Sequence, residues 1–364
     1  MVIGWSSSVS CWRWGRSTGG LISGYKLFVL IGCDMPYSVS DSFVKFRKEV
    51  VDLESEQTKA ARGSRDFVLQ NIEILSQKGL LPRLYSGMSL NFGSFERKTK
   101  KRELDDIDIM VCFSGVGGSY QTVVENTFYR VLFDRNIPVI SDCLEDDGTL
   151  NSRKMVNQLL GALNQVEHYK KAEKHRDHEA ARLQLSSYPW NFDIVPCFYT
   201  AQQFYLIPDG QGNWKNTDPR IDRNRVATCD QKHYGLVTQL IRLMKSWKEQ
   251  KWPESVSSYM FEQMVLDHIE SIPVLMAPTW QVRVLNVLGY LRSAIKNPVM
   301  DPKGIQGDLN ELDQETRDRL SLSAFMSSLS AAKAIEFERN GETQKAINQW
   351  KLVFGDQFPD YGRD

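Results

Sequence analysis

Residues 106–113 read DIDIMVCF and place two acids on an otherwise apolar segment. Side chains two positions apart on a β-strand point to the same face, so we expect Asp106 and Asp108 to stand side by side. Ile107 and Ile109 then point to the opposite face, into a core. Two carboxylates about 6–7 Å apart can share two Mg²⁺ ions separated by about 3.5–4 Å. The pattern therefore predicts a two-metal site on a sheet.

A third acid, Asp193, lies on a second apolar segment, FDIVPCF, at residues 192–198. By the same alternation, Phe192 and Ile194 face away from Asp193. Pro196 lacks an N–H, so we expect it at the end of a strand or at an edge of the sheet. A buried acid on an apolar strand is costly without a partner, which favours a cation site.

A Gly-Ser pair, Gly93-Ser94, follows an extended run at residues 84–92. Glycine lets a backbone approach phosphate oxygens closely, and Ser94 adds a hydroxyl and an N–H. Each motif is weak alone, because Gly and Ser form ordinary turns and acids often end strands. In this order and combination they predict a phosphate-and-metal site of the kind used for nucleotidyl transfer.

Together, the motifs GSFERKT, DDIDIMV and FDIVP resemble those of the polymerase-β-type nucleotidyltransferases. Within these, the chain is most similar to the CD-NTases, bacterial relatives of cyclic GMP–AMP synthase and 2′-5′ oligoadenylate synthetase. The resemblance extends over roughly residues 35–359 and includes four later segments: IPDGQGNWKNTDP (207–219), LIRLMKSWKEQ (240–250), SSYMFEQMV (257–265) and AINQWKLVFGDQFP (346–359).

The resemblance implies an α+β fold, a polymerase-β-type sheet with a C-terminal helical bundle and an active site in the cleft between the lobes. We expect a catalytic core at residues 35–225 and a helical domain at residues 226–364. The implied activity joins nucleoside triphosphates, ATP, GTP or others, into a cyclic di- or trinucleotide second messenger and releases pyrophosphate. The implied biology is bacterial antiphage defence (CBASS), in which a downstream effector senses the product.

The resemblance also assigns roles to the acids and the Gly-Ser pair. Asp106 and Asp108 are expected to hold two Mg²⁺ ions, for which Mn²⁺ can substitute. Asp193 is expected to bind the ion that activates the attacking ribose hydroxyl. Gly93 and Ser94 are expected to hold the donor triphosphate.

Three further residues are candidates for nucleotide binding. Lys245 lies on an apolar helical stretch, where most lysines are solvated, but the resemblance implies that it reaches the donor triphosphate. Ser258 could bind phosphate through its hydroxyl. Tyr259 could stack on a base or serve in packing, and Glu262 is expected to be a structural ion-pair partner.

Composition limits the other classes. The 364 residues carry 45 basic and 45 acidic side chains, and this neutrality argues against a long nucleic-acid template. Six cysteines without a CxxC pair argue against a zinc site, and Cys112 and Cys197 are expected to be neighbouring free thiols. No apolar span of roughly 20 residues could cross a bilayer, so we expect no membrane partner and a cytoplasmic location.

Residues 1–34 differ from the rest, since they hold no acid before Asp34 and are rich in Ser, Gly and Trp. We expect a disordered extension or an upstream translation start, with Met35 as the natural N-terminus.

The local patterns predict helices beginning near Ser40 with a stripe that includes Val44, then at residues 64–78, 121–134 and 152–166, and from 231 almost to the end. Gly79 is expected to end the second helix, and residues 115–122 to form a loop. A strand at 181–187 should pair with one at 190–198. His175 and His178 could share a helix face and bind metal, but a solvated face is expected instead.

Two rival functions remain open. One is a nucleotidyltransferase that modifies RNA or a small molecule with the same acids. The other is a catalytically silent nucleotide-binding scaffold, against which the three intact acids argue. The residues do not specify the bases, the linkage (2′-5′ or 3′-5′), the ring size or an activating ligand.

Overall fold

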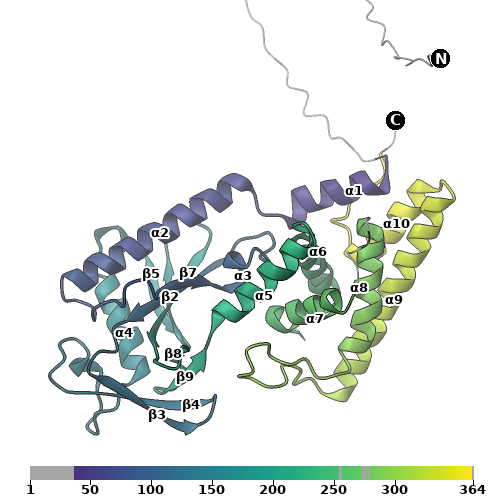
Figure 1. Cartoon of the computed structure of the whole chain (residues 1–364). Helices are drawn as coiled ribbons and strands as arrows, with labels where there is room; N and C mark the ends of the chain where they lie inside the picture. Colours follow the sequence, from purple (N-terminus) through teal and green to yellow (C-terminus); the bar gives the residue numbers. More distant parts are fainter. Residues whose placement is uncertain (1–36, 254–255, 273–276, 278, 363–364) are drawn as a thin grey trace, which may run out of the picture. The chain divides into compact units, whose positions relative to one another are not determined.

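A mixed β-sheet and a group of helices make up the described part of the chain (Figure 1). The computed structural model describes residues 37–253, 256–272, 277 and 279–362. The predictions for residues 1–34 and for a start at Met35 lie outside these residues.

Within the described residues, the strands form one sheet in the order β1-β2-β7-β8-β9-β4-β3, and a β5–β6 hairpin joins it through β6, which pairs with β7. The central pair β2 and β7 is parallel, and the other pairs are antiparallel. The strands are β1 (Leu90–Phe92), β2 (Asp106–Phe113), β3 (Gly118–Val124), β4 (Phe128–Phe133), β5 (Glu173–Asp177), β6 (Ala180–Gln184), β7 (Asn191–Tyr199), β8 (Tyr205–Pro208) and β9 (Trp214–Thr217).

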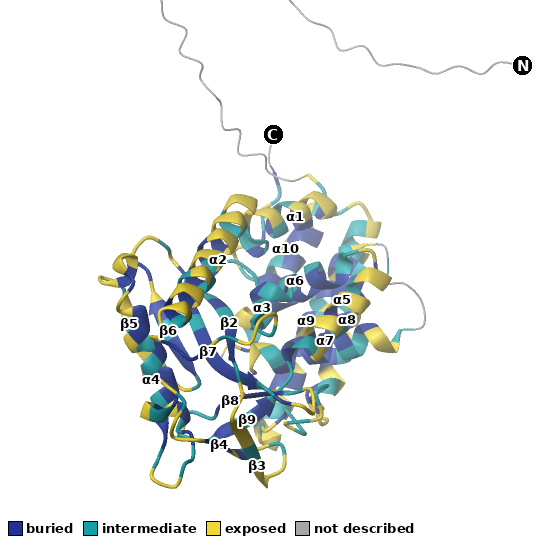
Figure 2. Cartoon of the chain, turned by 60° about the vertical axis from the view of Figure 1, so that its left-hand side comes forward, coloured by how far each residue is buried: buried dark blue, intermediate teal, exposed yellow. Residues whose placement is uncertain are grey.

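One face of the sheet is closed by helices, and this decides where the acids point. Ile107 and Ile109 are buried in a core shared with the helices α2 (Ser55–Gln77) and α4 (Ser152–Leu163). Figure 2 shows β2 and β7 in the buried colour beside α2. The predicted alternation is confirmed, because Asp106 and Asp108 occupy the alternate positions and so lie on the opposite face.

Pro196 lies within β7, paired with Val111 of β2, so its predicted place at a strand end or edge is wrong. The register explains how the strand accepts it. β6 pairs with residues 191–194 of β7, and β8 pairs with residues 198–199. Pro196 lies in the gap between these two partners, where the strand needs no ladder hydrogen bond on that side. The predicted neighbours Cys112 and Cys197 are cross-strand partners and buried free thiols.

The remaining helices pack around a second hydrophobic core. They are α1 (Val39–Phe46), α5 (Pro219–Lys232), α6 (Leu236–Lys251), α7 (Ser258–Ser271), α8 (Trp280–Ala294), α9 (Gln314–Arg339) and α10 (Thr343–Phe354), and a four-residue helix, α3 (Gly93–Glu96), follows β1. Helix α1 joins this core although it precedes the sheet in sequence, since Phe43 contacts Trp350 edge-on at 4.9 Å. The predicted boundary at 225/226 falls inside α5, and the division into two domains stays a prediction.

The N-terminal helices differ from their predicted limits. Ser38, not Ser40, caps α1 by accepting a hydrogen bond from the Asp41 N–H at 3.0 Å. Val44 is 56% exposed, because at about 100° per residue it lies on the side of α1 away from the buried Val39, Phe43 and Phe46, and a π-helical turn follows at Arg47–Val51. Helix α2 begins nine residues before the predicted start, in a polar segment without an apolar stripe, and ends before Gly79 as predicted.

The helix predicted at 121–134 is wrong, because pairing partners distant in sequence decide this segment. Residues 118–133 form the β3–β4 hairpin, and Tyr129 pairs with Trp214 of β9. The expected loop at 115–122 therefore ends in a strand. His175 lies on β5 and His178 follows it at a turn, and both are exposed, so the expected solvated position is confirmed although the element is a strand. The segment predicted to be extended, residues 84–92, contains the short strand β1 and an isolated β-bridge between Leu84 and Phe113.

The other predicted elements agree with the structure. Helix α4 begins at residue 152 as predicted and ends at Leu163, three residues before the predicted end. β6 pairs with β7, and the chain is largely helical after residue 231. Among the residues that the structure describes, none of the helices combines the length and the apolar character that crossing a bilayer requires.

Candidate active site

The parallel pairing of β2 and β7 brings the three acids together. Asp108 and Asp193 are direct cross-strand partners, and Asp106 is paired with Asn191. Neighbouring strands lie about 4.8 Å apart, so the Asp108 and Asp193 backbones are adjacent. All three acids therefore stand in one patch at the start of the two central strands.

Gly93 touches this patch and could not be another residue there. It follows Phe92, the β1 partner of Asp108, and adopts a φ of +73° at the start of α3. A Cβ at this position would lie 1.7 Å from Asp108 Oδ2. Both the left-handed backbone and the contact with the carboxylate require glycine. The Gly-Ser pair and the acid pair, which the sequence analysis placed in one site, thus lie against each other.

Two of the acids already have cationic partners. Arg182 donates from Nε and Nη2 to Asp193 at 2.8 and 2.9 Å, a bidentate pair. Lys100 lies 2.7 Å from Asp106 and also contacts Asp105. Although burial acts against the ammonium, Asp106 and Asp105 raise the pKa of Lys100 above its usual value.

Asp108 is different, since no hydrogen bond or ion pair to its carboxylate is present among the described residues. Burial, together with the charges of Asp106 and Asp193, raises the pKa of Asp108 to about 7. The cluster therefore contains one carboxylate that has no direct partner in the described part of the chain and whose charge Lys100 and Arg97 offset only in part.

Arg182 was missed by sequence reasoning, and so were the ion-pair roles of Lys100 and Asp105. A signal for Arg182 existed, because the predicted pairing of its strand with the Asp193 strand brings the two opposite each other. Lys100 has no such signal, since its contact depends on the course of the loop between α3 and β2.

The donor set fits divalent cations by its chemistry. Mg²⁺ and Mn²⁺ prefer carboxylate oxygens. A bound cation would neutralise the charge of the Asp108 carboxylate, which Lys100 and Arg97 offset only in part. In the part of the chain that the structure describes, no three acidic, histidine or cysteine side chains converge as a preformed metal site. Arg182 and Lys100 account for this, because they hold the Asp193 and Asp106 carboxylates.

Lys245 is buried and paired. Its ammonium contacts Glu262, whose side chain is 1% exposed. Glu262 also accepts hydrogen bonds from Arg97 Nε and Nη2, both at 3.1 Å. Burial alone would raise the pKa of Glu262, but Arg97 and Lys245 hold it below its usual value. The prediction that Glu262 is an ion-pair partner is confirmed, and the pair links α6 and α7 to the segment after α3.

Ser258 and Tyr259, at the start of α7, differ in their surroundings. Ser258 is exposed and lines the same cavity as Lys245. The Tyr259 hydroxyl lies 2.7 Å from Asp222 and 2.9 Å from Asp301, and the Lys303 ammonium lies 4.2 Å from its ring centroid. These contacts account for Tyr259 as a packing residue, and stacking on a base stays a prediction.

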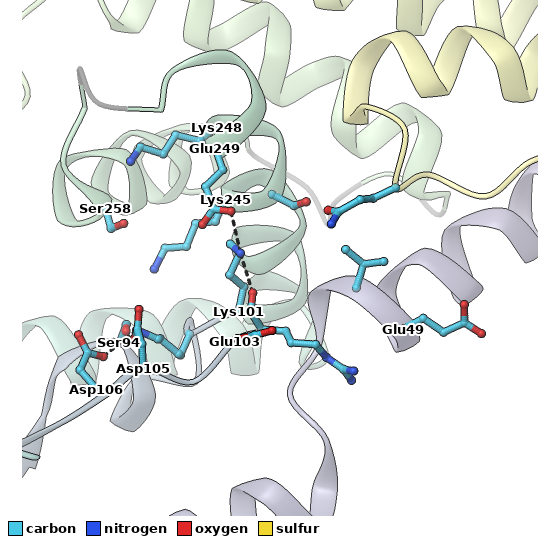
Figure 3. Close-up of a pocket in the computed structure, with 15 residues that line it drawn as sticks. Glu49, Ser94, Lys101, Glu103, Asp105, Asp106, Lys245, Lys248, Glu249 and Ser258 are labelled. Carbon is cyan, nitrogen blue, oxygen red and sulfur yellow. Dashed lines mark hydrogen bonds and ion pairs between the residues drawn. The ribbon is translucent and has the colours of Figure 1, made fainter. Parts of the chain in front are cut away.

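A cavity of about 880 Å³ lies between the sheet and α6. Figure 3 shows Ser94, Asp105 and Asp106 at one end, with Lys245, Lys248 and Ser258 across from them. Other lining residues are Glu49, Val50, Lys100, Lys101, Arg102, Glu103, Ser246, Glu249 and Gln357. The volume suits a nucleotide, and the lining combines acidic and basic side chains, with Lys245 and Lys248 across from Asp105 and Asp106.

Comparison with known proteins agrees with this site. No protein-family model matches the chain. A curated relative from Bacillus cereus (strain VD146), named a probable cyclic nucleotide synthase, is 40% identical over 334 residues, which are 90% of this chain and 99% of the relative.

Two solved structures share the fold. One is CdnC of Escherichia coli MS115-1 in complex with HORMA-deltaN, with a TM-score of 0.65 and 16% identity over 88% of this chain and 98% of that one. The other is the Vibrio cholerae DncV cyclic AMP-GMP synthase with the linear intermediate 5′ pppA(3′,5′)pG, with a TM-score of 0.63 and 11% identity over 90% and 97%.

The chain has the fold of CdnC and of the DncV cyclic AMP-GMP synthase. It belongs to the family of the probable cyclic nucleotide synthase of Bacillus cereus.

Proposed function

We propose that this protein joins nucleoside triphosphates into a cyclic di- or trinucleotide and releases pyrophosphate. The observation that carries the proposal is the patch formed by Asp106, Asp108 and Asp193 on two paired strands, beside a cavity of nucleotide size. The names of the relatives support it, since one is a cyclic nucleotide synthase and another is bound to a linear dinucleotide intermediate.

The three carboxylates are the residues that would hold divalent cations, for which we propose two Mg²⁺ ions or Mn²⁺ in their place. Bound there, the cations would neutralise charge on the attacking and leaving oxygens of the displacement. Asp193 can take part only after it exchanges Arg182 for a cation. Arg182 keeps a second carboxylate partner, Asp177 at 2.8 Å, to which it can remain bound.

The chain's own residues would bind and orient the donor triphosphate. Gly93, lacking a Cβ, lets the Gly93-Ser94 backbone lie directly against the Asp108 carboxylate, which would bring the phosphate contacts of Ser94 next to the acids. Ser94 would donate from its hydroxyl and its N–H, and Ser258 from its hydroxyl. Lys245 would supply a positive charge, whose position Glu262 holds.

The biological role that we propose is antiphage defence in bacteria, with an effector that senses the product. The substrates are cytoplasmic nucleoside triphosphates, and the neutral net charge suits small substrates better than a long nucleic-acid template.

The test is to incubate the protein with all four labelled nucleoside triphosphates and Mg²⁺ or Mn²⁺, treat with phosphatase, and identify the resistant products by mass spectrometry. A cyclic product that the Asp106→Asn variant does not form supports the proposal. Label found only on added RNA or on a small molecule would support the rival transferase. Triphosphate binding without turnover, under all conditions, would identify a silent scaffold.

A further inference from the structure

Lys248 lies on α6, about one turn beyond Lys245, and lines the same cavity. It is only 7% exposed. Among the described residues, no carboxylate or carbonyl oxygen forms a hydrogen bond or ion pair with its ammonium group. The adjacent acid, Glu249, pairs instead with Lys101 at 2.7 Å. Figure 3 shows the side chain of Lys248 on the same side of α6 as Lys245 and Ser258.

An unpaired ammonium at this depth is unfavourable for the folded protein. Burial removes part of the water around the charge and lowers the pKa of Lys248, and the charge of Glu249 offsets this only in part. Its neighbours Met244 and Trp247 are fully buried apolar residues, so the helix has apolar side chains where packing alone matters. An anion bound in the cavity would stabilise the Lys248 ammonium and so account for a lysine at this position.

Lys245 differs from Lys248, because its ammonium already has a charge partner within the protein. Glu262 contacts its ammonium and offsets its charge, whereas no acid among the described residues lies within ion-pair distance of the Lys248 ammonium. The two lysines also lie at different depths in the cavity. Burial lowers the pKa of Lys245, and the charges of Arg97 and Lys100, beside the acids, lower it further. Burial also lowers the pKa of Lys248, but there the neighbouring charge is Glu249, which raises it. In Figure 3, Lys245 lies between Lys248 and Asp106.

We propose that Lys248 binds the terminal phosphates of the nucleoside triphosphate, the end remote from the phosphorus that reacts. This inference rests on the proposed function, in which the α-phosphate lies at the acids. A triphosphate that extends from the acids along α6 passes Lys245 first and then meets Lys248. A lysine on a flexible stem suits this contact, because the charge can follow a mobile phosphate group.

The test uses the variant Lys248→Met, which keeps the length of the side chain and removes its charge. Calorimetry would measure binding of three probes: inorganic tripolyphosphate, an ATP analogue with a non-reactive α–β bridge, and AMP. We expect the affinity for both triphosphate probes to fall roughly ten- to a hundredfold, as for the loss of one charge-assisted contact. AMP binding should change little, and the melting temperature without nucleotide should equal or exceed that of the wild type.

A matched control is Lys333→Met, which removes a lysine charge from an exposed position on α9 and should leave all three affinities unchanged. The variant Lys248→Arg keeps a cation and should retain most of the triphosphate affinity. This second variant keeps the test valid if Lys248→Met folds poorly.

Unchanged triphosphate affinity in Lys248→Met would overturn the inference. So would an equal loss for AMP, or lowered melting temperatures and lost affinity in both the Met and the Arg variants, which would assign Lys248 to packing. The proposed function fails separately, in the wild type, if the protein binds tripolyphosphate but forms no cyclic product.

Discussion

Replacing Asp108 by asparagine should stabilise the metal-free protein while abolishing synthesis. The carboxylate is buried beside Asp106 and Asp193, and its pKa is raised from 3.8 to about 7. One pKa unit corresponds to about 1.4 kcal/mol, so the charge lowers the free energy of unfolding by at most about 4 kcal/mol. Because Asp108 keeps some contact with solvent, we expect a gain of about 2 kcal/mol at pH 8.

The stability difference between Asp108→Asn and the wild type should depend on pH. A carboxyl group whose pKa is higher in the folded state than in the unfolded state resists ionisation on folding. In the wild type, the contribution of the protonated Asp108 carboxyl group to the free energy of unfolding is therefore fully present below about pH 4. This contribution is lost as the pH rises towards 7. The advantage of Asp108→Asn should be absent near pH 4, grow up to about pH 7 and stay constant above it.

The measurement is denaturation of both proteins in EDTA at several pH values between 4 and 8. Asp105→Asn is the matched control, because Lys100 holds the pKa of Asp105 below its usual value despite partial burial, so this variant should gain no stability. An Asp108→Asn protein no more stable than the wild type at pH 8, or equally favoured at pH 4 and pH 8, would refute the charge argument. Near-normal synthesis by the variant would refute its role in metal binding.

Three other changes have definite expected outcomes. Gly93→Ala should lower the melting temperature and abolish synthesis, because the new Cβ meets a carboxylate oxygen at 1.7 Å; Gly87→Ala, with a similar positive φ but open space, should keep its activity. Lys245→Ala should weaken triphosphate binding roughly ten- to a hundredfold in a nucleotide titration. It should also lower the melting temperature, because the buried Glu262 loses a partner. Unchanged affinity would show that Lys245 has only a structural role. Deletion of residues 1–34 should leave activity and melting temperature unchanged, and a large drop in either would show that the segment belongs to the fold.

The roles of individual residues in the site remain predictions, but much of its layout follows from local sequence. The acids of DIDIMVCF share a face because strand alternation is a property of neighbouring residues. The same rule placed Asp193 opposite its own apolar neighbours. The Gly-Ser pair could be assigned to this site from the order of the motifs, which agrees with the contact between Gly93 and Asp108.

Helix and strand assignments failed where distant partners decide the outcome. The segment at 121–134 has enough apolar residues for a helix, yet it pairs with its own neighbour and with β9. Pro196 is tolerated inside a strand only because β6 ends and β8 begins on either side of it. Neither arrangement can be read from a window of adjacent residues.

The sequence by itself determined which residues carry charge, which faces of β2 and β7 they occupy, and which family the motifs resemble. Only the tertiary structure decided how those charges are paired. Arg97 and Glu262 are 165 residues apart in the chain, yet they share a buried ion pair with Lys245. Strand alternation depends on local backbone geometry, whereas ion pairing and burial depend on the whole fold. For this reason only the structure showed that, within the described residues, Lys248 and Asp108 have no direct ion-pair partner.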